Sequence, residues 1–202
     1  MTRRIDKHAP SNLLPAEPAR AVFLDRDGVI NEEVNYLCHP DEFRLLPRTA
    51  RAIRNLRQAG FRVVVVTNQS GLARGYFSQQ DLAAVHERML SELARARTHV
   101  DGIYICSHHP NDSCQCRKPG VLLFHQAAQD LKLRLDRSYF VGDKVTDLLP
   151  GKTLGGRTVL VLTGHGQQEQ ELAKQQGFQP DHVAADLYKA AEWIVHEDSP
   201  GL

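Results

Sequence analysis

The sequence predicts an α/β protein built on a mostly parallel sheet with helices on both faces. Short apolar runs rich in Val, Ile and aromatic residues recur along the chain, as in buried strands, and amphipathic stretches of helical period lie between them. Strands that alternate with helices form βαβ units and therefore parallel sheets. The runs lie at Ala21–Leu24, Val63–Val66, Ile103–Cys106, Tyr139–Val141 and Thr158–Leu162, and a sixth strand is indicated near His182–Ala184.

Four amphipathic stretches predict helices. Gly60 ends the first, and Ser78 with Asp81 three residues later begins the second in the manner of a capping box. Pro150 and Gly151 predict a short or kinked element in the stretch that contains them. The apolar stripes consist of Leu46, Ala50, Ile53 and Leu56 in the first helix, of Leu82, Val85, Met89 and Leu93 in the second, and more weakly of positions within residues 122–131 and 187–194.

Length and composition are those of an ordinary globular domain. The chain has 202 residues, of which 42% are hydrophobic and 24% charged. These values exclude collagen-like, coiled-coil and wholly disordered proteins. We expect a single domain over residues 19–196, preceded by a flexible, proline-containing leader at residues 1–18 and followed by a tail at residues 197–202.

Charge and hydropathy give no sign of a nucleic-acid or membrane partner. Lys plus Arg number 25 and Asp plus Glu number 24, for a net charge of +1, so there is no basic excess to attract nucleic acid or anionic lipid. No apolar run approaches the roughly 20 residues that span a bilayer, and the first residues lack the apolar segment of a secretory signal. We expect a cytoplasmic monomer that acts on a small molecule.

Acidic side chains follow two of the predicted strands, at the sheet edge where parallel α/β proteins bind ligands. Asp25 and Asp27 leave the first strand together, so one carboxylate can act as nucleophile and metal ligand and the other as general acid and base. Asp143, at the end of the fourth strand, would complete an oxygen site for Mg²⁺. Asp and Gly are also common in ordinary turns, and the pair by itself does not decide between the two interpretations.

Hydroxyl and cationic groups occupy the remaining positions of interest. Thr67 begins a segment of small polar residues and glycine, residues 67–71, which can hold an anion through O–H and N–H groups. Arg117 and Lys118, before the third helix, can clamp a phosphate. Each segment also has a plainer interpretation, the first as a capping loop and the second as a solvated basic turn.

Taken together and in this order, these elements resemble the haloacid dehalogenase (HAD) phosphatase superfamily, whose pattern is DxDG, then Thr or Ser, then Lys, then GDxxxD. The longer segments at residues 23–31, 67–75 and 116–119 are similar to the subfamily of heptose bisphosphatases and histidinol phosphatases. The resemblance covers roughly residues 20–185 and implies a Rossmann-like HAD fold. The residues that match the pattern are Asp25, Asp27, Thr67, Lys118, Asp143 and Asp147.

The resemblance implies hydrolysis of a phosphate ester with Mg²⁺. Asp25 would attack phosphorus and form an aspartyl-phosphate, while Asp27 would protonate the departing alkoxide and then deprotonate a water molecule. Mg²⁺ would bind to Asp25, Asp143 and the backbone carbonyl of Asp27. Thr67 and Lys118 would bind the other phosphoryl oxygens.

The spacing of these elements leaves no room for a full cap domain. Only 39 residues separate Asp27 from Thr67 and 50 separate Thr67 from Lys118, and the predicted helices, strand and loops already use them. We therefore expect an open site whose selectivity comes from loops, unless those loop residues simply face solvent. Asp147 would orient Lys144 or a metal-bound water. The candidate substrate-binding residues are Glu33, Val34, Asn35, Tyr36, Asn68, Gln69, Ser70, Arg74, Arg117 and Lys144.

Three cysteines and a histidine have the spacing C-x-H-x5-C-x-C. In a chain without an export signal such a cluster favours metal over disulfide, the alternative being reduced thiols in a loop. Zinc with four protein ligands has no open position and is structural, and the resembling subfamily carries a zinc loop of this kind. His109 is an alternative to His108, although the spacing favours His108, and Cys38 lies apart. The predicted zinc loop, residues 106–116, has the ligands Cys106, His108, Cys114 and Cys116.

The resemblance implies removal of the 7-phosphate of D-glycero-D-manno-heptose 1,7-bisphosphate, in the biosynthesis of nucleotide-activated heptose for lipopolysaccharide. Arg117 and Arg74 are the candidates for binding the second phosphate. Histidinol phosphate is the alternative substrate, and the zinc loop does not distinguish the two. A DNA 3′-phosphatase is disfavoured by the near-neutral charge, and an inactive phosphate-binding protein by the filled catalytic positions.

Overall fold

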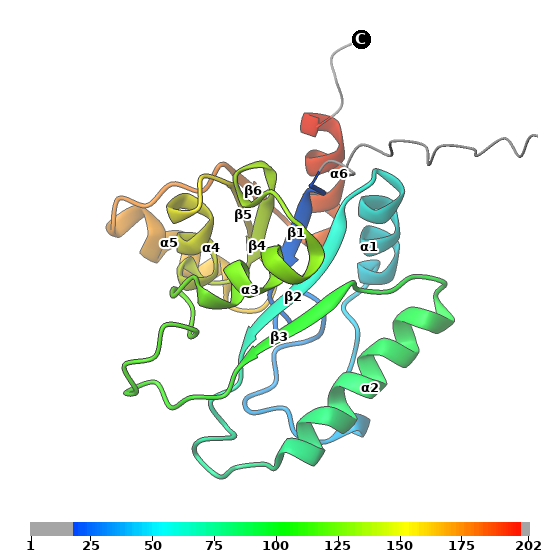
Figure 1. The fold of residues 1–202 in the computed structure, drawn as a ribbon, viewed down its shortest axis with the longest axis vertical. Coiled ribbons are helices and arrows are strands. Elements are labelled where there is room, and N and C mark those ends of the chain that lie inside the picture. The colour runs from blue at the N-terminus through cyan, green and yellow to red at the C-terminus, as the bar shows by residue number, and fades with distance from the viewer. Residues whose placement is uncertain (1–17, 199–202) are drawn as a thin grey trace, which may run out of the picture.

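The computed structural model describes residues 18–198 and contains a six-stranded parallel sheet (Figure 1). The strand order is β3-β2-β1-β4-β5-β6, and all neighbouring strands pair in parallel. The predicted α/β class is confirmed, and so is the sixth strand. The strands are β1 (Ala21–Leu24), β2 (Arg62–Asn68), β3 (Gly102–Cys106), β4 (Tyr139–Gly142), β5 (Arg157–Val161) and β6 (His182–Ala184).

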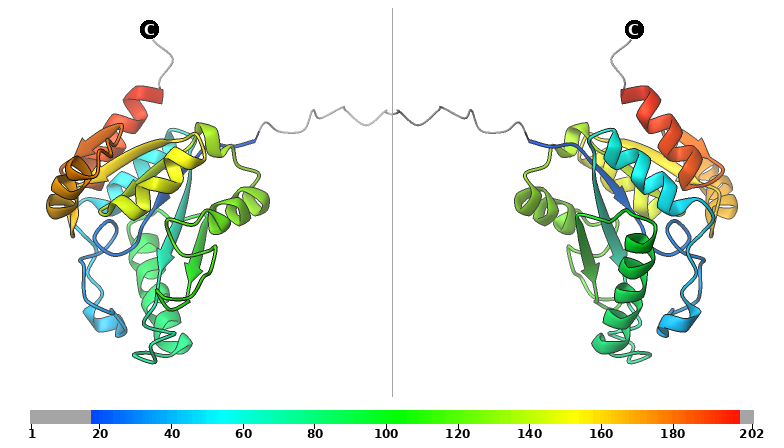
Figure 2. Two further views of the ribbon diagram at one scale, coloured as in Figure 1. Left: turned by 90° about the vertical axis from the view of Figure 1, so that its left-hand side faces the viewer. Right: turned by 90° about the vertical axis from the view of Figure 1, so that its right-hand side faces the viewer.

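Helices cover both faces of the sheet, as Figures 1 and 2 show. They are α1 (Thr49–Gln58), α2 (Gln79–Arg95), α3 (Leu122–Leu131), α4 (Val145–Thr153), α5 (Gly166–Gln175) and α6 (Leu187–Asp198), with short 3-10 helices at Pro40–Glu42 and Leu135–Arg137. Buried residues of α1, α2 and α6 share one apolar core, and those of α3 belong to a second core on the other face. Helix α4 packs over Phe140 in that second core, and α5 lies beside α4.

Strand β1 lies inside the sheet, between β2 and β4. Its side chains alternate between the two cores: Val22 and Leu24 pack with α1, α2 and α6, whereas Ala21 and Phe23 pack on the face of α3. Because β1 is the third of the six strands in the sheet, the chain that leaves it emerges near the middle of the carboxyl edge. This placement positions residues 25–28 for the site described below.

The predicted start of α2 is confirmed. The Ser78 hydroxyl accepts a hydrogen bond from the Asp81 N–H (3.2 Å), and the Asp81 carboxylate accepts one from the Ser78 N–H (2.8 Å), which completes a capping box. The stretch predicted to form a short or kinked element is α4, a nine-residue helix with Pro150 inside it.

Two helices differ from the sequence prediction. Leu46 was expected in the first helix, but α1 begins only at Thr49, because Pro47 precedes Arg48, whose backbone is left-handed (φ 64°). Helix α5 was not predicted, since its sequence is polar and only Gly166 and Ala173 are buried. A helix that buries so little apolar surface has no stripe for the periodicity to detect.

The predicted leader at residues 1–18 lies, except for Pro18, outside the described residues. Helix α6 continues to Asp198, two residues beyond the predicted domain end at residue 196, and the remainder of the predicted tail lies outside the described residues. Among the described residues, none of the helices is both long enough and apolar enough to cross a membrane.

Candidate active site

A cavity of about 390 Å³ lies at the carboxyl edge of the sheet, over the ends of β1 and β2 and the start of α4. Arg74 is exposed and does not line this cavity. The cavity brings together the other predicted catalytic and substrate-binding residues, which are Asp25, Asp27, Glu33, Val34, Asn35, Tyr36, Thr67, Asn68, Gln69, Ser70, Arg117, Lys118 and Lys144.

Lys118 lies at the centre of a buried charge cluster. Its ammonium Nζ is 2.8 Å from Asp25 Oδ1, 2.8 Å from Asp147 Oδ1 and 2.7 Å from the carbonyl oxygen of Val66, so its three N–H groups all have acceptors. Burial alone would lower the pKa of Lys118, but the charges of Asp147 and Asp25 outweigh burial and raise this pKa. Lys118 is therefore a buried cation that holds the predicted nucleophile.

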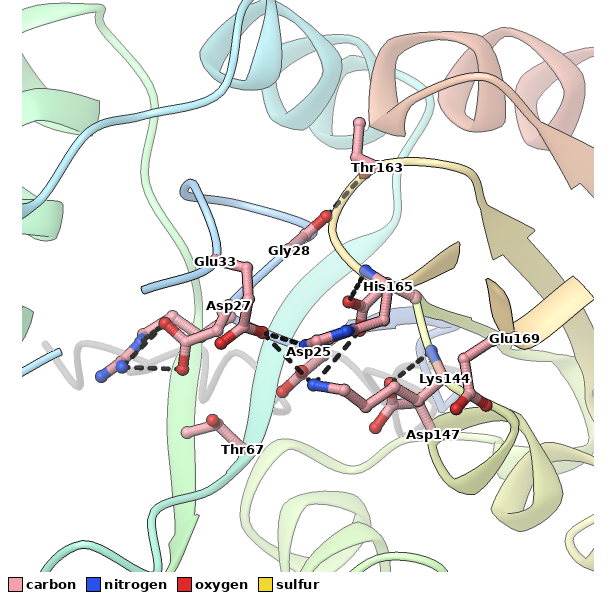
Figure 3. Close-up of polar contacts among 12 residues, drawn as sticks. Asp25, Asp27, Gly28, Glu33, Thr67, Lys144, Asp147, Thr163, His165 and Glu169 are labelled. Atoms are coloured by element: carbon pink, nitrogen blue, oxygen red, sulfur yellow. Dashed lines mark hydrogen bonds and ion pairs between the residues drawn. The ribbon is translucent and has the colours of Figure 1, made fainter. Parts of the chain in front are cut away.

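Asp147 has a different main partner from the one predicted. Its carboxylate pairs with the ammonium of Lys118, and its contact with Lys144 is a hydrogen bond accepted from the backbone N–H (3.1 Å; Figure 3). Asp147 was expected to orient Lys144 or a metal-bound water, and the structure shows it holding the backbone of Lys144, while the role toward a metal-bound water stays a prediction. Only the folded chain brings residue 118 beside the first turn of α4, so the spacing in the sequence could not reveal this pair.

Asp143 is a fully buried carboxylate with an unsatisfied oxygen. Its Oδ2 accepts the His165 N–H (2.8 Å), whereas Oδ1 has no hydrogen-bond partner among the described residues and lies 4.0 Å from Lys144 Nζ. Burial, followed by the charge of Asp147, raises the pKa of Asp143 to about 8. Leaving a carboxylate oxygen buried and unpaired is unfavourable, and a cation bound there would remove the penalty.

The carboxylates around Asp143 fit a magnesium ion. One oxygen from each of Asp25, Asp143 and Asp147 lies within 4.8 Å of the others, and carboxylate oxygens are the ligands that Mg²⁺ prefers. Of the predicted ligands, Asp25 and Asp143 belong to this group. The carboxylate of Asp27 does not, and the backbone carbonyl of Asp27 as a ligand stays a prediction.

Gly28 permits the chain to close tightly over Asp143. Its φ is 77°, and a Cβ at this position would lie 2.3 Å from Asp143 Oδ2. A Cβ at Gly164, on the other side of the same carboxylate, would also lie 2.3 Å from that oxygen. The hydroxyl of Thr163 donates a hydrogen bond to Gly28 O (2.6 Å), which joins the two loops (Figure 3).

Three side chains hold the carboxylate of Asp27. The Arg26 Nη2 donates to both of its oxygens (2.8 Å each), Asn31 Nδ2 donates to Oδ1 (2.9 Å), and Gln69 Nε2 donates to Oδ2 (3.0 Å). The sequence analysis missed Arg26 and Asn31. The signal for Arg26 was its position two residues after Leu24, because alternation along a strand buried on both faces directs residue 26 inward.

Polar side chains at the end of β2 are already bonded to other residues of the site. The Asn68 side chain accepts the N–H of Lys118 (3.0 Å) and donates to the carbonyl oxygen of Lys118 (3.2 Å). Gln69 Nε2 donates to Thr67 Oγ1 (2.9 Å) as well as to Asp27. Asn68 and Gln69 were predicted to bind substrate, and their contacts within the chain position Lys118, Thr67 and Asp27.

Glu33 connects two loops at the mouth of the cavity. Its Oε2 lies 3.2 Å from Lys144 Nζ and 3.6 Å from His165 Nε2 (Figure 3). Glu33 and Lys144 were predicted to bind substrate. His165 and Thr146 also line the cavity, but no motif in the sequence singled them out.

Arg117 lines the cavity and carries a buried donor nitrogen that is unsatisfied among the described residues. The side chain is half-buried, and its Nη1 is buried without a hydrogen-bond partner among the described residues. A buried guanidinium nitrogen without an acceptor is unfavourable.

The four predicted zinc ligands converge in space. Their ligand atoms all lie within 4.8 Å of one another, with His108 Nδ1 3.1 Å from Cys116 Sγ. Cys106 Sγ lies 3.2 Å from Cys116 Sγ and 3.8 Å from Cys114 Sγ, and these cysteines are free thiols. Three sulfur atoms and one imidazole nitrogen in this arrangement fit a tetrahedral zinc ion.

His109 is turned away from the cysteine cluster. Its ring Nδ1 accepts a hydrogen bond from the Asn111 N–H (3.2 Å), and its own N–H donates to Asp112. Of the two histidines left open by the sequence, the structure therefore places His108 with the cysteines.

Comparisons with known proteins agree with this fold and site. A model of the family described as HAD-hydrolase-like matches residues 115–190, from the end of the cysteine cluster to the first turn of α6. The fold and the site thus define a HAD-like hydrolase. Relatives whose names state an activity identify the family within this class.

The chain is 41% identical to the D-glycero-D-manno-heptose-1,7-bisphosphate 7-phosphatase of Chlorobaculum tepidum over 89% of this chain and 96% of the relative. It is also 41% identical to the D-glycero-beta-D-manno-heptose-1,7-bisphosphate 7-phosphatase of Escherichia coli over 90% of this chain and 91% of the relative. The chain therefore belongs to the D-glycero-D-manno-heptose-1,7-bisphosphate 7-phosphatase family.

A solved structure supports the same assignment. The crystal structure of D,D-heptose 1,7-bisphosphate phosphatase from B. bronchiseptica, complexed with magnesium and phosphate, matches with a TM-score of 0.81 and 38% sequence identity. The match covers 88% of this chain and 99% of that chain. The resemblance expected from the sequence, including the HAD fold, is confirmed.

Proposed function

We propose that this chain is a Mg²⁺-dependent phosphatase that removes the 7-phosphate of D-glycero-D-manno-heptose 1,7-bisphosphate. The observation that supports this most is the buried contact of Asp25 with Lys118 at the cavity, beside the unsatisfied oxygen of Asp143. A nucleophile, a fixed cation and an acidic cluster that fits a metal ion are the groups that phosphate ester hydrolysis requires. The family membership of the chain supplies the substrate class.

The reaction would proceed in two steps. A carboxylate oxygen of Asp25 attacks phosphorus, the bond from phosphorus to the sugar oxygen breaks, and Asp27 gives its proton to that oxygen. Asp27 then takes a proton from a water molecule, whose oxygen attacks phosphorus and releases inorganic phosphate with Asp25 regenerated. Mg²⁺ held by Asp25, Asp143 and the carbonyl of Asp27 would supply positive charge that offsets the phosphoryl oxygens.

Lys118 and Thr67 would position the phosphoryl group. All three N–H groups of Lys118 have acceptors in the structure, so a phosphoryl oxygen would replace one of them when substrate binds. The hydroxyl of Thr67, which accepts from Gln69, keeps its own proton for a phosphoryl oxygen. Both side chains are almost completely buried, and their positions are therefore fixed before substrate arrives.

Zinc would have a structural role. Cys106, His108, Cys114 and Cys116 would provide all four ligands and leave no position for substrate. Cys116 directly precedes Arg117 and Lys118, so a rigid zinc loop would fix both cations against the cavity.

That the chain acts as a cytoplasmic monomer on a small molecule, without a nucleic-acid or membrane partner, stays a prediction. Histidinol phosphate stays the competing substrate to be tested, although the relatives named above are heptose bisphosphatases.

Phosphate release from a panel of esters tests the proposed function. We expect the heptose 1,7-bisphosphates to be hydrolysed with a higher kcat/KM than fructose bisphosphate or histidinol phosphate, and only when Mg²⁺ is present. Asp25→Asn should reduce turnover by more than about a thousandfold, because the nucleophile is lost. Asp41→Asn, which changes an exposed carboxylate, is the control. Turnover of Asp25→Asn within tenfold of wild type would remove Asp25 as nucleophile.

Metal analysis of protein purified without oxygen tests the zinc site. About one zinc per chain is expected, from the four-ligand arrangement. Cys116→Ser should lose zinc and unfold at a lower temperature, whereas Cys38→Ser, which alters the cysteine outside the cluster, should keep both the zinc and the stability of the wild type. Zinc-free wild-type protein, or zinc able to replace Mg²⁺ in turnover, would contradict the structural role.

Arg117 is the candidate for the second phosphate. A charge-assisted hydrogen bond of this kind contributes roughly 1.5–3 kcal/mol. Arg117→Ala should therefore lower kcat/KM for the bisphosphate by about tenfold to a hundredfold, with a much smaller effect on a monophosphate. Arg74→Ala, at the exposed arginine outside the cavity, is the matched comparison. An equal loss on both substrates would mean that Arg117 binds the transferred phosphoryl group instead.

A further inference from the structure

Arg26 is a completely buried arginine between the two predicted catalytic aspartates. Val22 and Leu24 of β1 face the core that α1, α2 and α6 cover, and residue 26 continues that alternation beyond the end of the strand. The side chain thus enters the protein on the side of α2. Burying a guanidinium is unfavourable unless its N–H groups are paired, so its partners indicate what it does.

The partners of Arg26 are Asp27 and His86. Arg26 Nη2 donates to both oxygens of Asp27 at 2.8 Å, and Nε donates to Oδ1 at 3.0 Å. Nη1 lies 3.1 Å from Nε2 of His86, a buried residue of α2. A planar fork that binds a carboxylate through two nitrogens fixes the orientation of that carboxylate as well as its position.

His86 acts as a hydrogen-bond acceptor for Arg26. Burial, followed by the charge of Arg26, lowers the pKa of His86 to about 4, so the imidazole is neutral near pH 7. Its Nε2 then accepts from the guanidinium, which has only donors. His86 is thereby the fixed point on α2 from which Arg26 extends to Asp27.

The two oxygens of Asp27 have different surroundings. Oδ1 accepts from Arg26 and from Asn31, both completely buried. Oδ2 accepts from Arg26 and from Gln69, which lines the cavity. Gln69 Nε2 also donates to Thr67 Oγ1 and keeps that acceptor when it releases Asp27. Oδ2 is therefore the oxygen that can exchange a protein donor for the oxygen of a substrate.

We propose that Arg26 and His86 are positioning residues that hold Asp27 so that its Oδ2 carries the proton exchanged with the leaving group and with water. This inference rests on the proposed function, in which Asp27 is the general acid and base. It adds a connection from helix α2, through two buried side chains, to the group that moves the proton. Neither residue touches the cavity, so both act through Asp27.

How strongly a variant's rate depends on the leaving group of the ester distinguishes this positioning role from a merely structural one. A sugar alkoxide needs a proton as it departs, whereas p-nitrophenolate departs without one. His86→Leu fills the space but removes the acceptor, and His86→Gln keeps a carbonyl oxygen that can accept from Arg26. Val85→Ala, at the neighbouring buried residue of α2, is the control for loosened packing.

We expect His86→Leu to lower the single-turnover rate with the heptose bisphosphate by about tenfold to a hundredfold, as small misplacements of catalytic groups do, with KM little changed. The rate at which p-nitrophenol is released in the first turnover of p-nitrophenyl phosphate should change less than threefold. His86→Gln should regain most of the lost rate. Val85→Ala should keep the wild-type ratio of the first-turnover rates with the two substrates.

Equal losses on both substrates, or no recovery in His86→Gln, would overturn the proposal. If His86→Leu does not fold, His86→Asn, whose shorter side chain cannot reach Arg26, is compared with His86→Gln by the same ratio. A wild-type protein inactive on heptose bisphosphate would refute the proposed function alone, because the ratio can still be measured with whichever alkyl phosphate the wild type hydrolyses.

Discussion

The site depends on the buried ammonium of Lys118. It joins Asp25 after β1, the carbonyl of Val66 in β2 and Asp147 in α4, so one side chain connects three segments at the sheet edge. When the carboxylates of Asp25, Asp143 and Asp147 are all ionised, their three negative charges exceed the one positive charge of Lys118 by two. Buried charges need partners, and Lys144, at 4.0 Å from Asp143 Oδ1, is partly exposed. A divalent cation is the group that completes the balance.

The two aspartates of the first motif are held from opposite faces of the sheet. Asp25 is held by Lys118, whose backbone is bonded to Asn68 and which lies between the cysteine cluster and α3. Asp27 is held by Arg26, which reaches α2 on the other face. Two adjacent carboxylates with separate supports can perform different tasks, one as nucleophile and one as acid and base.

The sequence predicted the elements that carry strong local signals. Strands buried on both faces, the capping box at Ser78 and the cluster of three cysteines with His108 all repeat or space residues in ways that a single sequence displays. The pairing of Lys118 with Asp147 and the burial of Arg26 depend on contacts between distant segments, which no local pattern encodes. Arg74 was expected to bind substrate, but it is exposed and lies outside the cavity, which no local pattern in the sequence could show.

Thermal unfolding with and without Mg²⁺, for the wild type and for Asp143→Asn, tests most directly whether a divalent cation completes the buried cluster. A ligand that binds only the folded state raises Tm. With Mg²⁺ at about a hundred times its Kd, the wild type should gain about 5–10 °C. Above the pKa of about 8 that burial gives Asp143, its carboxylate is ionised, and Asp143→Asn then removes the unpaired charge, so this variant should be at least as stable as the wild type without Mg²⁺ and gain nothing from it. An equal response of both proteins, or no response of the wild type, would contradict the account.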